Sequence, residues 1–179
     1  MKLSTSNPLI RFLVFSVLLY VLWYVLYELW IHPQGAVDAF AINQIVEHAR
    51  FILEAIGYRL NPDDVYAGEF VNTIGILGTA GVWIGDPCNG ITLFALFTGF
   101  ILAFPGPIRR KLWFIPMGIL SIHLLNVIRV VALVIVSNYW PETLDFNHTY
   151  TFTILVYSYV FLLWYLWATK YSQVDVSKA

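Results

Sequence analysis

Hydrophobic residues gather in four long stretches of the chain, and most polar residues lie between them. The stretches occupy residues 9–30, 88–108, 112–136 and 148–168. A helix that crosses a bilayer needs about 17–25 mostly apolar residues. Each stretch reaches this length, the second only if its helix begins near Cys88. We therefore predict an all-α integral membrane protein, a bundle of about four transmembrane helices that forms a single domain over residues 1–179.

The segment 31–87, between the first two stretches, mixes polar and apolar positions. Its residues 36–56 alternate with helical spacing, and Gly57 supplies a C-terminal stop. Such an amphipathic helix suits the membrane interface or a cap over the bundle. Residues 70–77 and 80–84 are spaced to pair as a short β-hairpin across the two residues between them. We therefore expect one amphipathic helix and one short hairpin in this segment.

Composition agrees with a membrane protein and excludes several other classes. Of the 179 residues, 59% are hydrophobic and 12% are charged, whereas soluble domains carry about 25% charged residues. No basic arm, zinc-ligand spacing or aromatic–basic interleaving indicates nucleic-acid binding. No glycine-rich loop indicates a phosphate site. The sequence therefore predicts no nucleic-acid partner, no metal and no cofactor.

Basic residues predict the orientation, because Lys and Arg concentrate on the cytoplasmic side of membrane proteins. The loop 106–111 contains Arg109, Arg110 and Lys111, and both ends of the chain carry further lysines. This distribution predicts a cytoplasmic (inner) membrane protein with cytoplasmic termini and with segment 31–87 outside. The first stretch starts like a signal peptide, but its apolar part is too long and no small-residue cleavage site follows. We interpret it as a retained anchor.

Three polar residues on different stretches reach the same depth. At about 1.5 Å per helical residue, Cys88 lies about 31 Å, Arg129 about 27 Å and His148 about 33 Å from the nearest cytoplasmic basic residues of their stretches. The hydrocarbon core of a bilayer is about 30 Å thick. We therefore expect a thiol, a guanidinium and an imidazole to lie together at the outer boundary of the membrane.

Cys88 is the only cysteine of the chain, so it forms no internal disulfide, and one cysteine cannot supply the several ligands of a cysteine-bound metal site. It is either a small packing residue or a nucleophile. Pro87 and Gly90 favour a tight turn around it. A position at the N-terminus of the second span would also favour its thiolate. This context favours the nucleophile.

Arg129 lies inside an apolar stretch, where burying a charged side chain in lipid costs at least about 2.5–3.5 kcal/mol. It either snorkels to the outer surface or faces a polar cavity, and Asn126 on the same helical face favours the cavity. His148 begins the last stretch and can carry a proton near neutral pH. Its rival His123 lies in mid-membrane, where we expect it to hydrogen-bond within the bundle. Residues expected to orient His148 or bind substrate are Asp86, Asn89, Asn126 and Asn147.

The order Cys88-Asn89-Gly90, Asn126-x-x-Arg129 and His148 on successive stretches resembles the exosortase/archaeosortase family, in a short form with a compact core. The resemblance covers roughly residues 86–167. In that family an outward-facing Cys, Arg and His form the catalytic set of a membrane-embedded transpeptidase. By the resemblance these roles fall on Cys88, Arg129 and His148. Many members have Ser where this chain has Asn89, and many have additional spans.

The resemblance implies a cysteine transpeptidase or peptidase that acts on secreted proteins at the outer face of the membrane. Its substrates would carry a C-terminal sorting signal with a short motif, a transmembrane helix and a basic tail. The reaction would pass through a thioester on Cys88. A glycan or a lipid would accept the product, or water would, which gives plain proteolysis. Membrane lipid is the other expected partner.

Other functions stay open at this point. In a non-catalytic membrane subunit or a small transporter, Arg129 and Asn126 would line a substrate path, although no internal repeat typical of transporters is visible. A thiol-redox enzyme would need an external thiol, because the chain has one cysteine. A metal-dependent protease would need a His/Glu spacing that the sequence lacks.

Overall fold

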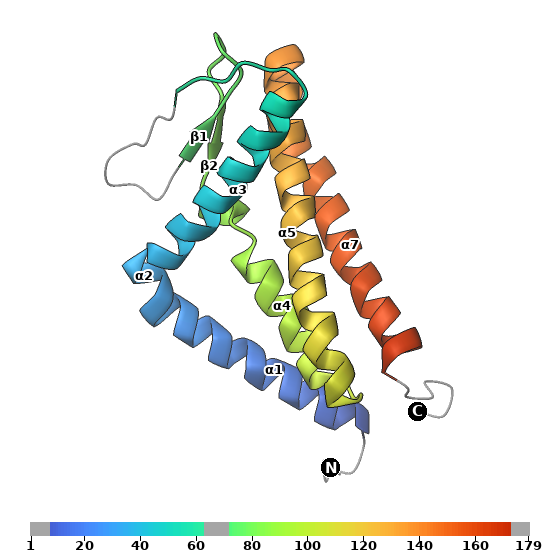
Figure 1. The fold of residues 1–179 in the computed structure, drawn as a ribbon. Helices are drawn as coiled ribbons and strands as arrows, with labels where there is room; N and C mark the ends of the chain where they lie inside the picture. Colours follow the sequence, from blue (N-terminus) through green and yellow to red (C-terminus); the bar gives the residue numbers. More distant parts are fainter. Residues whose placement is uncertain (1–7, 63–71, 173–179) are drawn as a thin grey trace.

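The computed structural model describes residues 8–62 and 72–172, whose fold is mainly helical (Figure 1). The helices are α1 (Pro8–Leu26), α2 (His32–Gln34), α3 (Ala36–Ala55), α4 (Ile91–Ala103), α5 (Ile108–Tyr139), α6 (Leu144–Phe146) and α7 (Phe152–Leu166). The strands between α3 and α4 are β1 (Asn72–Ile74) and β2 (Val82–Ile84). Single π-helical turns lie at Tyr27–Ile31, Asn147–Thr151 and Trp167–Tyr171, and 3₁₀ turns lie at Asp86–Cys88 and Pro141–Thr143.

In the described part of the chain, three helical segments are long and apolar enough to cross a membrane: Leu9–Gln34, Ile108–Tyr139 and Pro141–Tyr171. They correspond to the first, third and fourth predicted stretches. The second stretch is helical only over α4, whose 13 residues measure about 20 Å. α4 ends because Phe104 precedes a proline and is extended (φ −70°, ψ 136°). A fourth span through α4 therefore stays a prediction.

α4, α5 and α7 enclose an apolar core in the half of the fold that contains the α4–α5 loop (Figure 1). Phe97 of α4, Ile122 of α5 and Trp167 after α7 are 0% exposed in this core. α1 packs against α4 from outside and leaves many large apolar side chains uncovered. A lipid environment tolerates such a surface, because lipid tails are as apolar as these side chains.

A second core lies between α3, the strands and the C-terminal half of α5. α3 matches the predicted segment 36–56 to within a residue and packs its apolar face, including Ile45 and Leu53, onto α5. The helix stops at Gly57 (φ +97°), since this left-handed conformation favours glycine. The amphipathic segment therefore caps α5 rather than standing apart from the bundle.

The two strands form a short antiparallel pair in which Thr73 lies opposite Trp83. The paired segments are shorter than the ranges 70–77 and 80–84, and their connection is longer than two residues. Residues 70–71 lie outside the described part of the chain. β2 leads directly into the Asp86–Cys88 turn, so the strand pair positions that turn.

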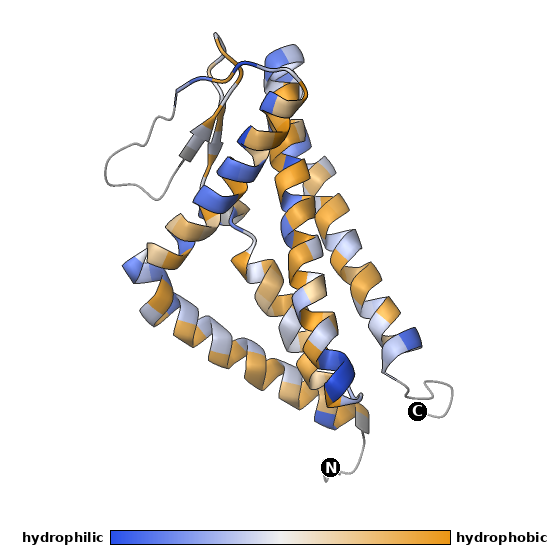
Figure 2. Ribbon diagram, in the orientation of Figure 1, coloured by the Kyte–Doolittle hydropathy of each residue, from blue (hydrophilic) through white to orange (hydrophobic). Residues whose placement is uncertain are grey.

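Figure 2 shows how polarity divides the fold. Hydrophobic residues dominate α1, α4 and α7, whereas hydrophilic residues follow α3 and reappear at the start of α5. The two polar regions lie at opposite ends of α5 (Figures 1 and 2). This separation is typical of a protein with an apolar band between two aqueous faces.

Gly118 of α5 lies directly under the Phe97 ring of α4, so that a Cβ at this position would overlap the ring. We expect Gly118→Ala to lower the free energy of unfolding by about 1–3 kcal/mol, even though alanine favours helix by about 1 kcal/mol. Gly99→Ala is the matched control, because nothing lies within 4 Å of a Cβ there. Thermal unfolding in detergent measures both variants. Equal stability of the two variants would contradict the close packing.

Candidate active site

A cavity of about 310 Å³ lies between the start of α4, the middle of α5 and the start of α7. Its polar lining includes Asp86, Asn89, Asn126, Arg129 and His148. Thr92, Thr149, Thr153 and Tyr157 add hydroxyl groups. The cavity lies at the end of α4 that is remote from the basic loop 106–111 (Figure 1).

Cys88 contacts His148, one of the residues that line this cavity. Cys88 is the last residue of the Asp86–Cys88 turn and is 5% exposed. Its Sγ lies 3.3 Å from His148 Nε2. His148 belongs to the π-helical turn Asn147–Thr151, and such turns are frequent at functional sites. Residues from separate predicted stretches are therefore within hydrogen-bonding distance.

Two asparagines hold the backbone around Cys88. Asn126 Nδ2 donates to the Cys88 carbonyl at 2.7 Å, and Asn89 Oδ1 accepts from the Ile91 N–H at 2.9 Å. The second bond satisfies one of the unpaired donors at the start of α4. Gly90 (φ +79°) completes the turn, where a Cβ would crowd Asn126 Nδ2 at 3.3 Å. These asparagines thus orient the thiol-bearing turn rather than His148.

Arg129 lies buried at the cavity instead of extending outward. Its side chain is 8% exposed, whereas a snorkelling arginine keeps its head group in water. Within residues 8–62 and 72–172, the buried Arg129 Nε, Asn126 Oδ1 and Asp86 Oδ1 have no hydrogen-bond partner. An unpaired buried polar group costs about 1–3 kcal/mol. A polar ligand in the cavity would satisfy these atoms.

Burial raises the pKa of the Cys88 thiol above its ordinary value, and the positive charge of Arg129 opposes this shift. The sequence led us to expect that a helix N-terminus stabilises the Cys88 thiolate. This stabilisation is weak, because α4 begins only at Ile91, three residues after Cys88. The neutral thiol therefore prevails at pH 7. His148 Nε2 is the group in position to take its proton.

A buried carboxylate that the sequence did not single out supports the site. Asp38 of α3 is 0% exposed and accepts hydrogen bonds from Tyr27 Oη (2.6 Å) and Asn89 Nδ2 (2.6 Å) at Oδ1. His32 Nδ1 lies 3.2 Å from its other oxygen. The available signal was the position of Asp38 one turn before Ile42 on the apolar face of the predicted helix. Asp38 links the turn after α1 and the helix α3 to Asn89, the residue after Cys88.

Removing this carboxylate should disturb both stability and the site. We expect Asp38→Ala to lower the free energy of unfolding by about 3–5 kcal/mol, because it leaves buried donors unpaired. Glu47→Ala is the control on the exposed side of α3, with an expected change within about 0.5 kcal/mol. Chemical denaturation measures stability, and iodoacetamide labelling measures exposure of Cys88. Unchanged stability and labelling in Asp38→Ala would contradict a positioning role.

The remaining sequence candidates lie elsewhere. Asn147 Nδ2 donates to the Thr143 carbonyl (3.0 Å) and hydroxyl (3.2 Å) and does not line the cavity, so its role beside His148 stays a prediction. His123 Nε2 lies 3.1 Å from His48 Nδ1, a contact within the bundle. In the part of the chain that the structure describes, no group of three or more His, Cys, Asp or Glu could hold a metal ion.

Comparison with protein-family models identifies a match over most of the chain. The family model described as "Transmembrane exosortase (Exosortase_EpsH)" matches residues 3–168. No curated protein and no solved structure matches the chain significantly. The matched range includes the cavity and each of the three spanning segments except the last residues of the third.

Proposed function

This chain belongs to the transmembrane exosortase family, and on that premise we propose that it is a membrane-embedded cysteine transpeptidase. It cleaves a C-terminal sorting signal of secreted proteins through a thioester and transfers the product to an acceptor. The observation that supports this function best is the 3.3 Å separation of Cys88 Sγ and His148 Nε2. A transport path or a structural subunit requires no such contact.

The first half-reaction forms the thioester. His148 Nε2 takes the proton of Cys88 as Sγ attacks the carbonyl carbon of the scissile peptide bond. Arg129 donates to the oxyanion of the tetrahedral intermediate, which the unpaired Nε of the guanidinium makes feasible. The C–N bond then breaks, and His148 returns the proton to the leaving amine.

The second half-reaction releases the new carboxyl terminus of the substrate. A hydroxyl or amine of a glycan or lipid acceptor attacks the thioester, with His148 as base, and the thiol leaves as Cys88 regains its proton. Water in place of the acceptor gives hydrolysis. Both outcomes use the same three residues.

The proposed orientation places the termini and loop 106–111 in the cytoplasm, with the cavity at the outer face. Basic residues support it, since they lie at the end of α4 remote from the cavity. The transmembrane helix of a substrate would then present a peptide bond just outside the hydrocarbon core. A membrane-impermeant thiol reagent tests this orientation at Cys88.

The decisive experiment follows an intermediate rather than a phenotype. The protein is co-expressed with a secreted substrate that carries a motif, a transmembrane helix and a basic tail. We expect a shortened product and a substrate adduct on Cys88 that hydroxylamine removes, because hydroxylamine cleaves thioesters. Processing that proceeds with the adduct on another residue would overturn the assignment of the nucleophile. Failure to process any such substrate would overturn the proposed function.

A further inference from the structure

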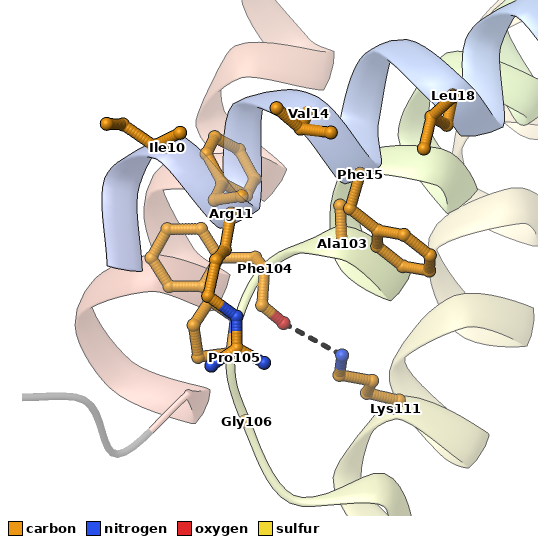
Figure 3. A pocket seen from close by; sticks show the side chains of 11 residues that line it. Ile10, Arg11, Val14, Phe15, Leu18, Ala103, Phe104, Pro105, Gly106 and Lys111 are labelled. Atoms are coloured by element: carbon orange, nitrogen blue, oxygen red, sulfur yellow. Dashed lines mark hydrogen bonds between the residues drawn. The ribbon is translucent and has the colours of Figure 1, made fainter. Parts of the chain in front are cut away.

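A second cavity, of about 650 Å³, lies at the opposite end of the fold between α1 and the α4–α5 loop (Figure 3). The first turns of α1 form one side, and Phe104, Pro105 and Gly106 form the other. Lys111 enters from α5. α4 separates this cavity from Cys88, so it takes no part in the proposed peptide cleavage.

Lys111 holds a positive charge in the wall of this cavity. The residue is 8% exposed, and its Nζ donates to the carbonyls of Leu102 and Phe104 at 2.8 Å each. An ammonium group has three N–H donors. The two bonds satisfy carbonyls at the end of α4, and one N–H donor is left for a ligand.

Arg11 brings a second positive charge to the same place. Figure 3 shows its guanidinium reaching from α1 to the loop beside Pro105, while Lys111 reaches the Phe104 carbonyl from the other side. Among residues 8–62 and 72–172, no acidic residue lines the cavity. Among the described residues, no ion pair is found for Arg11 or Lys111. Within that part of the chain the two cations therefore have no carboxylate partner.

The rest of the cavity wall is apolar and continues along α1. Val14, Phe15 and Leu18 line it and are 53%, 48% and 60% exposed. They extend about 10 Å from Arg11 toward the middle of the helix. A charged end and an apolar wall match an amphiphile with an anionic head and a hydrocarbon chain. The basic tail of the proposed substrate has the wrong charge for this cavity.

We propose that this cavity binds an anionic phospholipid of the adjacent leaflet. Arg11 and Lys111 donate to its phosphate oxygens, and an acyl chain lies along Val14, Phe15 and Leu18. Guanidinium and ammonium groups both bind phosphate well. Basic pockets between transmembrane helices are a recognised type of phospholipid site on the cytoplasmic side. Bound lipid would join α1 to the α4–α5 loop.

Lipid titration of the purified full chain in a neutral detergent tests this site. Native mass spectrometry measures the affinity for phosphatidylglycerol and for phosphatidylcholine, and thermal unfolding measures stabilisation by each lipid and by inorganic phosphate. We expect phosphatidylglycerol to bind more tightly and to raise Tm. Equal binding of the two lipids would overturn the proposal, and equal stabilisation by inorganic phosphate would replace the lipid with a free anion.

Arg11→Gln is the informative variant, because Arg11 is exposed and Lys111 also secures the end of α4. We expect Arg11→Gln to weaken phosphatidylglycerol binding about tenfold, as for loss of a charge-assisted hydrogen bond, and to leave Tm without lipid unchanged. Arg109→Gln removes the same charge from the same end of the fold but does not line the cavity. Equal weakening by both variants would indicate general surface attraction and overturn a specific site. Because the readout is lipid binding, its failure would leave the proposed peptide cleavage untouched.

Discussion

Replacing Cys88 with alanine should abolish processing of a tripartite substrate. Removal of a catalytic nucleophile lowers turnover by at least about 10³-fold, which a mobility assay records as no product. The loss should reflect chemistry rather than unfolding, because Cys88→Ala removes only one sulfur atom from a core. Substrate mobility on gels measures turnover, and thermal unfolding in detergent measures the fold.

The cavity offers a matched set of controls for this result. Thr92, Thr149 and Thr153 line it with hydroxyl groups. We expect alanine at each of these positions to leave substantial processing. Cys88→Ser should retain only a trace, since a hydroxyl is a far weaker nucleophile than a thiol. Normal processing by Cys88→Ala, together with loss of processing in one threonine variant, would show that the hydroxyl of that threonine, and not the Cys88 thiol, is the nucleophile.

The gross architecture was predictable because it depends on local properties. Apolar length predicts the spanning segments, and helical spacing predicts α3 to within a residue. The number of residues from the cytoplasmic basic positions, multiplied by the helical rise per residue, predicted a common depth for Cys88, Arg129 and His148. In the structure, Cys88 and His148 are in contact and Arg129 lines the same cavity. Depth along a helix follows from sequence position, since the rise per residue is constant.

Contacts between elements were not predictable in this way. Asp38 reaches Asn89 across 51 positions, and the spacing of α3 alone indicates only that a carboxylate lies on an apolar face. Asn147 shows the converse, because it is adjacent to His148 yet bonds to Thr143. The direction of each side chain depends on helix rotation, and packing between helices determines that rotation.

The position of α4 also explains why the site tolerates buried polar groups. α4 is short, so the Cys88 turn begins within the bundle and its backbone needs partners from outside the helix. Asn126 and Asn89 supply them. Irregular backbone is tolerated where its polar groups find partners inside the protein. The same arrangement leaves Arg129 facing that cavity.

Arg129→Gln should lower processing by about 10²–10³-fold, the usual effect of removing one oxyanion donor. Arg129→Lys should recover only part of the loss, because an ammonium lacks the planar fork of a guanidinium. Arg59→Gln is the control, since Arg59 is exposed on the segment between α3 and the strands. Initial rates of product formation measure all three variants. Wild-type rates in Arg129→Gln would remove the oxyanion role.

The same substitution has a second readout that does not depend on a substrate. Arg129 lowers the pKa of Cys88 against the effect of burial, so Arg129→Gln should raise that pKa further. A higher thiol pKa means less thiolate at a given pH, and only the thiolate reacts with iodoacetamide. The pH at half-maximal alkylation rate should therefore move upward in Arg129→Gln and stay at the wild-type value in Arg59→Gln. A downward shift would show that Arg129 does not stabilise negative charge on Cys88, and therefore that its charge does not act at the reacting atoms.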